Sequence, residues 1–142
     1  MDYEVEFEKA RGKNSKYIKE FEKWLKAKGL AIKTIKNHID NVDLYINDYL
    51  NRYEIGKMED GCCRIDGFLG DWFIRKCMWS TAYSIKTTAA SIKKFYLCMS
   101  ELGYVNRDDY KFLCNEIKDG MDDWIEEVEE YNSGDFDYFD VF

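Results

Sequence analysis

The sequence predicts an all-α fold, a compact bundle of about five helices, and three observations lead to that prediction. The 142 residues contain no proline and few glycines outside the joints between segments, which is typical of long helices with short turns. Hydrophobic residues make up 46% of the chain and aromatic residues 17%, enough for a core. In most segments the apolar residues recur at helical spacing. A chain of this length fits one domain that needs no disulfide or metal.

The first helix is predicted over residues 15–28. Tyr17, Phe21 and Leu25 recur every four residues and so share one face. Gly29 supplies the left-handed backbone conformation that ends such a helix. Residues 1–14 are charged and lack a clear period, so we interpret them as an N-terminal arm or a frayed lead-in to this helix.

The second helix is predicted over residues 33–53, where apolar residues alternate in steps of four and three and form a seam for helical partners. A loop through Gly56 and Gly61 then leads to a third helix over residues 66–78. Asp66 is the expected N-cap of that helix, because its carboxylate can accept a hydrogen bond from the free N–H groups of the first turn.

Two longer helices complete the predicted domain, which comprises residues 15–131. Ser84 is expected to cap the fourth helix, and Gly103 to end it. Asn106 is expected to cap the fifth, and two aspartates follow in the first turn, where the helix dipole favours anions. The apolar period of this helix continues through Gly120, which predicts one long helix with a weak point there. Residues 132–142 mix acidic and aromatic residues without a period, so we interpret them as a tail.

Charge is unevenly distributed along the chain. The formal net charge of −7 argues against a strongly basic nucleic-acid binder. However, residues 72–100 contain five basic residues and no acid, whereas residues 121–142 contain nine acids and no base. The middle of the chain therefore offers a basic segment and the C-terminal part an acidic one.

Several classes of site and location are not indicated. The five cysteines are odd in number and form no C-x-x-C pair, so we interpret them as small buried hydrophobic residues in a reducing compartment. A single histidine, His38, rules out a site built from several histidines, and we expect it to be partly buried. There is no segment apolar enough to cross a bilayer and no signal-peptide core. We expect a cytoplasmic protein without cofactor or metal.

Two segments carry a resemblance to a known family. They are KGLAIKTIKNHI at residues 28–39 and YSIKTTAASIKKFYLCMSELGYV at residues 83–105. In this order, with a helix between them and a Gly-Tyr-Val exit, they resemble the core-binding (SAM-like) domain of tyrosine recombinases, the phage-integrase family. The resemblance covers residues 15–105 and implies a helical bundle that clamps one side of a DNA duplex.

In that family the DNA contacts come from the starts of the second and fourth helices. The resemblance therefore implies DNA-binding roles for Lys33, Thr34, Lys36, Asn37, Lys86, Thr87, Lys93 and Lys94. The chemistry suits these positions, because a helix N-terminus presents free N–H groups to a phosphate, and lysine and threonine side chains add charge and hydrogen bonds. The same lysines could instead simply solvate an exposed helix face. Thr88 is expected to face partly inward.

The sequence also departs from the family pattern. Ala31 replaces the usual serine cap of the second helix, and Asn106 opens another helix where an Asn-Pro exit is usual. The catalytic half, with two arginines, a histidine or lysine set and a nucleophilic tyrosine, is not recognisable, so we expect no strand cleavage and no catalysis. The alternative prediction is a protein-interaction module that uses the acidic C-terminal helix together with Phe136, Tyr138 and Phe139. Oligomeric state is not indicated.

Overall fold

The computed structural model describes residues 2–52 and 55–140, with only the backbone given for residues 134–140. Every regular element in these ranges is helical, which confirms the predicted all-α class. Among the described residues, no helix has the length and apolar content needed to cross a bilayer. In chain order the elements are α1 (Tyr3–Ala27), α2 (Ile32–Asp43), the π-helix η1 (Leu44–Tyr49), the 3-10 helix η2 (Met58–Cys63), α3 (Ile65–Gly67), the π-helix η3 (Phe68–Trp72), α4 (Phe73–Lys76), α5 (Ala82–Glu101) and α6 (Arg107–Asp140).

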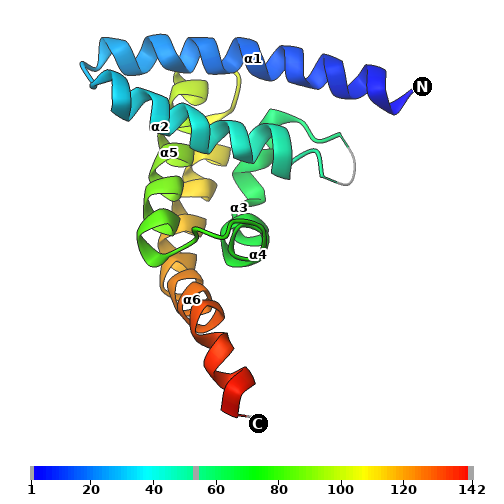
Figure 1. Ribbon diagram of the computed structural model, residues 1–142. Coiled ribbons are helices and arrows are strands. Elements are labelled where there is room, and N and C mark those ends of the chain that lie inside the picture. The colour runs from blue at the N-terminus through cyan, green and yellow to red at the C-terminus, as the bar shows by residue number, and fades with distance from the viewer. Residues whose placement is uncertain (1, 53–54, 141–142) are drawn as a thin grey trace.

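The helices form two crossed groups. α1 and α2 run in opposite directions at one end of the molecule, and α5 and α6 pack against each other at a steep angle to them (Figure 1). The short helices α3 and α4 pack on the side of α6, and the C-terminal part of α6 extends beyond the body (Figure 1). The aromatic-rich core lies where these groups meet. Its largest fully buried side chains are Phe21, Leu25, Tyr45, Ile46, Ile65, Phe68, Leu69, Phe73, Ile85, Phe95, Tyr96 and Trp124.

α1 begins at Tyr3, so the interpretation of residues 1–14 as an arm separate from the first helix is wrong. Asp2 caps the helix, since its side chain accepts a hydrogen bond from the backbone N–H of Glu4 at 3.1 Å. Asn14, in the predicted arm, is 4% exposed, and its Nδ2 donates to the side chain of Asn47 at 2.9 Å and to the Ile46 carbonyl at 3.2 Å. These polar contacts fix the first half of α1, and apolar periodicity cannot reveal them.

Gly29 ends α1 with a φ of 81°, as predicted. The predicted second helix is present as α2 followed by the π-helical turn η1. The predicted third helix is instead divided into α3, η3 and α4. Asp66 is not its N-cap but lies inside α3, where it accepts a hydrogen bond from Nε1 of Trp124 in α6 at 2.7 Å.

The cap of α5 also differs from the prediction. Thr81 is the N-cap, and Ser84 takes part in a reciprocal capping box with it. Gly103, with a φ of 86°, follows the end of α5 as predicted. Asn106 caps α6, because its Oδ1 accepts from the N–H of Asp109 at 2.8 Å. α6 passes through Gly120 without a break, and its backbone includes most of the predicted tail, up to residue 140.

Candidate nucleic-acid interface

The predicted DNA-binding residues of α2 all lie on the surface. Lys33, Thr34, Lys36 and Asn37 are exposed. Ala31 is the N-cap residue of α2 and makes no side-chain hydrogen bond to the first turn. Because an alanine leaves the first N–H groups of the helix without a side-chain acceptor, they remain available to an anion such as a phosphate.

The predicted residues of α5 form one stripe with a single exception. Lys86, Lys93 and Lys94 are exposed, and their spacing of seven and eight residues places them on one side of the helix. Thr87 is only partly buried, but its hydroxyl donates to the Ser84 carbonyl at 3.2 Å, so it is engaged within the helix. Thr88 is 2% exposed and belongs to the interior.

A polar crossing point joins α2 to α5. The Ser91 hydroxyl lies 2.8 Å from Nδ1 of His38, accepts from Nδ2 of Asn41 at 3.0 Å, and donates to the Thr87 carbonyl at 3.0 Å. A hydroxyl has one proton to donate, and the His38 tautomer with Nδ1–H is the one that fits donation from Ser91 to the Thr87 carbonyl. These contacts join α2 to α5.

His38 is partly buried, as predicted. Burial lowers the pKa of its imidazole, and the nearby Lys94 ammonium lowers that pKa further. The same interaction indicates that Lys94 lies close to α2. Lys33 precedes His38 by five residues and Lys86 precedes Ser91 by five residues, so each lies about 8 Å from the crossing point along its helix axis. Five residues also correspond to about 140° around a helix axis, so Lys33 and Lys86 point away from the contact, and Lys94 is the predicted lysine that lies beside it.

α1 adds a third group of lysines that the sequence analysis did not single out. From Lys9 to Lys28 the chain contains eight basic residues and two acids. Lys19, Lys23 and Lys26 are exposed and recur in steps of four and three, on the side opposite the buried Phe21 and Leu25. Counting charges within the predicted helix would have found them.

A shallow hollow connects these α1 lysines to α2. Lys26 and Lys36 line it from opposite sides, together with Ile32 and Ile35. Glu22 also lines it and pairs with Lys26 at 3.6 Å, but both side chains are largely exposed, so this pair is weak. We use the name basic face for the exposed lysines of α1, α2 and α5, which are Lys19, Lys23, Lys26, Lys33, Lys36, Lys86, Lys93 and Lys94.

The acidic residues of α6 form no ion pair with the lysines of α2 and α5 among the described side chains. α6 packs on α5, on the short helices α3 and α4, and on η2 and η3. Within the described side chains, none of the lysines at the starts of α2 and α5 has a carboxylate within 4.0 Å. No ion pair therefore joins these lysines to a carboxylate of α6 in the part of the chain whose side chains the structure describes.

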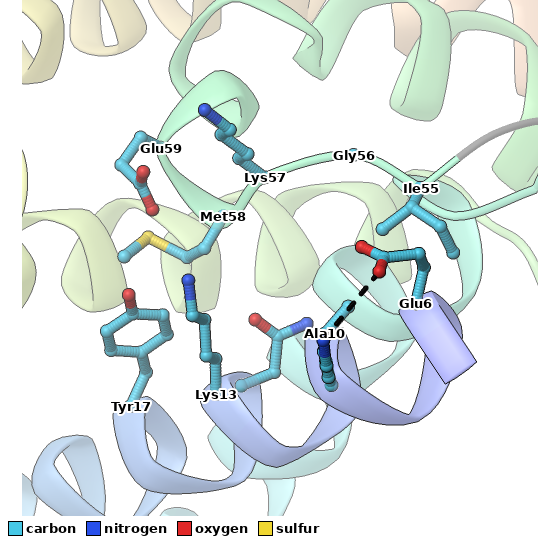
Figure 2. Close-up of a pocket in the computed structure, with 11 residues that line it drawn as sticks. Glu6, Ala10, Lys13, Tyr17, Ile55, Gly56, Lys57, Met58 and Glu59 are labelled. Carbon is cyan, nitrogen blue, oxygen red and sulfur yellow. Dashed lines mark ion pairs between the residues drawn. The ribbon is translucent and has the colours of Figure 1, made fainter. Parts of the chain in front are cut away.

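A second hollow, of about 370 Å³, opens between the first half of α1 and residues 55–59 (Figure 2). Lys13 and Tyr17 rise from α1, and Lys57 and Glu59 come from the opposite wall (Figure 2). Burial raises the pKa of the Tyr17 hydroxyl, and the neighbouring Glu59 raises it further. Positive and negative side chains alternate around this hollow, so its charge does not select an anion or a cation.

The cysteines form neither a disulfide nor a metal centre in the part of the chain that the structure describes. Cys62, Cys77 and Cys98 are buried, which agrees with their interpretation as small hydrophobic residues, whereas Cys63 is exposed and Cys114 is partly exposed. Burial raises the pKa of Cys62 and of Cys98 to about 12. These two thiols therefore stay protonated near neutral pH.

Comparisons with models of protein families, with curated proteins and with solved structures gave no match for this chain.

Proposed function

We propose that this chain binds duplex DNA, mainly through the phosphate backbone, and that it does so on the basic face without cutting the strands. The observation that carries the proposal is the exposure of every predicted lysine of α2 and α5, together with a hollow that Lys26 of α1 and Lys36 of α2 line. α2 and α5, which carry the predicted lysines, meet where His38 contacts Ser91. Exposed lysines on neighbouring helices are what binding to a phosphate backbone requires.

The start of α2 gives this surface a specific phosphate site. Lys33 and Thr34 are exposed in its first turn, and the Ala31 N-cap does not occupy the N–H groups there. The start of α5 is different, because Thr81 and Ser84 bond to each other's backbone N–H groups at 3.1 and 2.7 Å. We therefore assign direct N–H contacts with phosphate to α2, and contacts through lysine side chains to α5.

The net charge of −7 is compatible with this proposal because charge is unevenly distributed: residues 72–100 contain five basic residues and no acid, whereas residues 121–142 contain nine acids and no base. A phosphate within a Debye length of about 8–10 Å responds mainly to nearby lysines rather than to the summed charge. The all-helical arrangement with an exposed basic second helix also suits the SAM-like core-binding type of integrases. We extend the proposal to that relationship and to the absence of catalysis.

The test is fluorescence anisotropy of a labelled duplex of about 25 base pairs, roughly 85 Å of B-form helix, titrated at low salt and then over a salt series. Lys86→Glu/Lys93→Glu should weaken binding strongly and should reduce the salt slope by about two. The matched control is Lys57→Glu/Lys111→Glu, which makes the same charge change at exposed positions outside the basic face.

Equal weakening in the two double variants would mean that only total charge matters, and it would contradict the proposed face. If the unchanged chain does not bind the duplex at low salt, the proposed function is wrong. A third variant, Ala31→Ser, introduces the missing helix cap. It should weaken duplex binding modestly while stabilising the fold by about 0.5–2 kcal/mol, because the serine competes with phosphate for the same N–H groups.

The second candidate function is a protein-interaction module that uses the acidic C-terminal segment. Phe136, Tyr138 and Phe139, which the sequence suggested for this role, have side chains outside the described part of the structure. What favours this candidate is a different group of apolar residues, at the turn between α4 and α5, where Met78 and Trp79 are 99% and 63% exposed.

A further inference from the structure

Large apolar side chains gather on the surface where α4 ends and α5 begins. Met78 is 99% exposed, Trp79 is 63% exposed, and Tyr131 of α6 is 53% exposed. Met78 and Tyr131 line a common hollow of about 510 Å³. An exposed group of this kind next to a hollow is unusual for a surface in contact with water alone, and it is typical of an interaction site.

This surface is held in place by the fold. Nδ2 of Asn132 donates to the Ser80 carbonyl at 2.9 Å, which fastens α6 to the turn. The Trp79 ring meets the buried Phe73 ring edge to face at a centroid separation of 6.4 Å. Trp79 therefore contacts the core through Phe73 while it remains 63% exposed. A pre-positioned aromatic side chain loses little conformational freedom when a partner covers it.

The charge beside the hollow is negative. Six acids and no base occur in residues 121–133. Asp123 and Glu127 are exposed and precede Tyr131 by eight and four residues, so they continue the Tyr131 side of α6. Arg75, the cation that lines the hollow, pairs with Asp71 at 2.6 Å and also interacts with Glu127. A segment that docks here thus meets apolar residues next to the acidic part of α6, where six acids outnumber Arg75.

We propose that the hollow between the α4–α5 turn and α6 docks a lysine- or arginine-rich amphipathic segment of a partner protein. An apolar anchor of that segment covers Met78, Trp79 and Tyr131, and its cations face Asp123 and Glu127. Charge complementarity selects this occupant, because the carboxylates repel a nucleic acid or an acidic peptide. The docking surface uses residues other than the lysines of the basic face, so it does not depend on DNA binding.

The probe is a synthetic peptide of roughly 18 residues, about 27 Å long as a helix, with leucine at helical spacing and lysine elsewhere. Its binding to the full chain is measured by isothermal titration calorimetry. The matched peptide has glutamate in place of every lysine. The lysine peptide should bind and the glutamate peptide should not. Met78→Ser/Trp79→Ser should weaken binding at least about tenfold, the loss expected for a central aromatic anchor.

Two further variants separate the parts of the proposal. Asp123→Lys/Glu127→Lys should weaken the lysine peptide severalfold without changing either apolar anchor. Ile32→Ser, which removes another strongly exposed apolar side chain on α2, should leave peptide binding unchanged. Circular dichroism confirms that each variant is folded, and all the altered side chains are exposed.

Unchanged affinity in Met78→Ser/Trp79→Ser would overturn the proposal, since the peptide would then adhere by charge alone. Concentration-dependent dimerisation that this variant abolishes, without peptide binding, would assign the surface to a second copy and overturn the proposed occupant. The same variant should keep its full affinity for duplex DNA, whereas the lysine variants of the basic face should keep theirs for the peptide. Failure of either proposal can therefore be told apart from failure of the other.

Discussion

Replacing Gly120 with alanine should destabilise the protein, although glycine is the poorer residue inside a helix. Trp124 is 1% exposed, and its indole folds back over Gly120, one turn earlier in α6. A Cβ atom at Gly120 would collide with the indole carbons Cζ2 and Cε2. The ring cannot move away freely, because a Cβ at Gly70 on its other side would lie 2.9 Å from Cδ1, and Asp66 holds its Nε1 at 2.7 Å.

The magnitude follows from two opposing terms. Glycine to alanine inside a helix adds about 0.8–1.0 kcal/mol of stability through propensity alone. Overpacking of a fixed core side chain costs about 1–3 kcal/mol. Gly120→Ala should therefore lower the free energy of unfolding by up to about 2 kcal/mol. Gly12→Ala is the matched control, because a Cβ there meets nothing within 4 Å, and it should raise the free energy of unfolding by about 0.8–1.0 kcal/mol.

The assay is urea denaturation followed by circular dichroism, with thermal melting as a second measurement. The difference between the two alanine variants isolates the overpacking cost, and each kcal/mol should shift the melting temperature by about 2–4 °C. If Gly120→Ala stabilises the protein as much as Gly12→Ala does, then Trp124 is not clamped between Gly70 and Gly120, and the reasoning is wrong.

Two further predictions concern titration and thiol reactivity. Because burial and Lys94 lower the pKa of His38 in the folded state, the unfolded chain binds more protons, so stability should fall as the pH drops below about 6.5. His38→Gln should lose part of this pH dependence in urea denaturation between roughly pH 7.5 and 5.5; identical slopes in the two proteins would refute the assignment. With Ellman's reagent at about pH 8, the exposed Cys63 should react first and Cys98 only on unfolding, since burial raises the pKa of Cys98 to about 12. The fast phase should disappear in Cys63→Ser, and its persistence would show that another thiol is accessible.

The sequence by itself determined the helical class and most helix boundaries. Absence of proline, apolar periodicity and glycine signals are local properties, and local sequence controls where a helix starts and ends. Gly29 and Gly103 both have the left-handed conformation that was predicted, and Asn106 caps α6 as expected. These residues act on their own backbone neighbours, so no tertiary contact was needed to interpret them.

Predictions failed where a side chain acts on a distant segment. Asp66 resembles an N-cap in sequence, but its partner is Trp124, 58 residues away. Asn14 looks like part of a charged arm, yet its amide bonds to the segment around Asn47. The sequence does not distinguish a polar residue that hydrogen-bonds to a buried partner from one that is solvated. Only the packed structure distinguishes the two cases.

For the candidate interface, too, one part could be predicted from the sequence and another part depended on tertiary packing. The sequence located the exposed lysines of α2 and α5 through helical spacing and a family resemblance, but it could not show whether they share a surface. Tertiary packing decides that: the contact of His38 with Ser91 joins the two helices, and Lys26 of α1 and Lys36 of α2 line one hollow. Packing also placed α6 against α5, with Asn132 of α6 beside Ser80 in the turn after α4. Net charge is a sum over the chain, whereas binding depends on which charges lie next to one another, and that is a property of the fold.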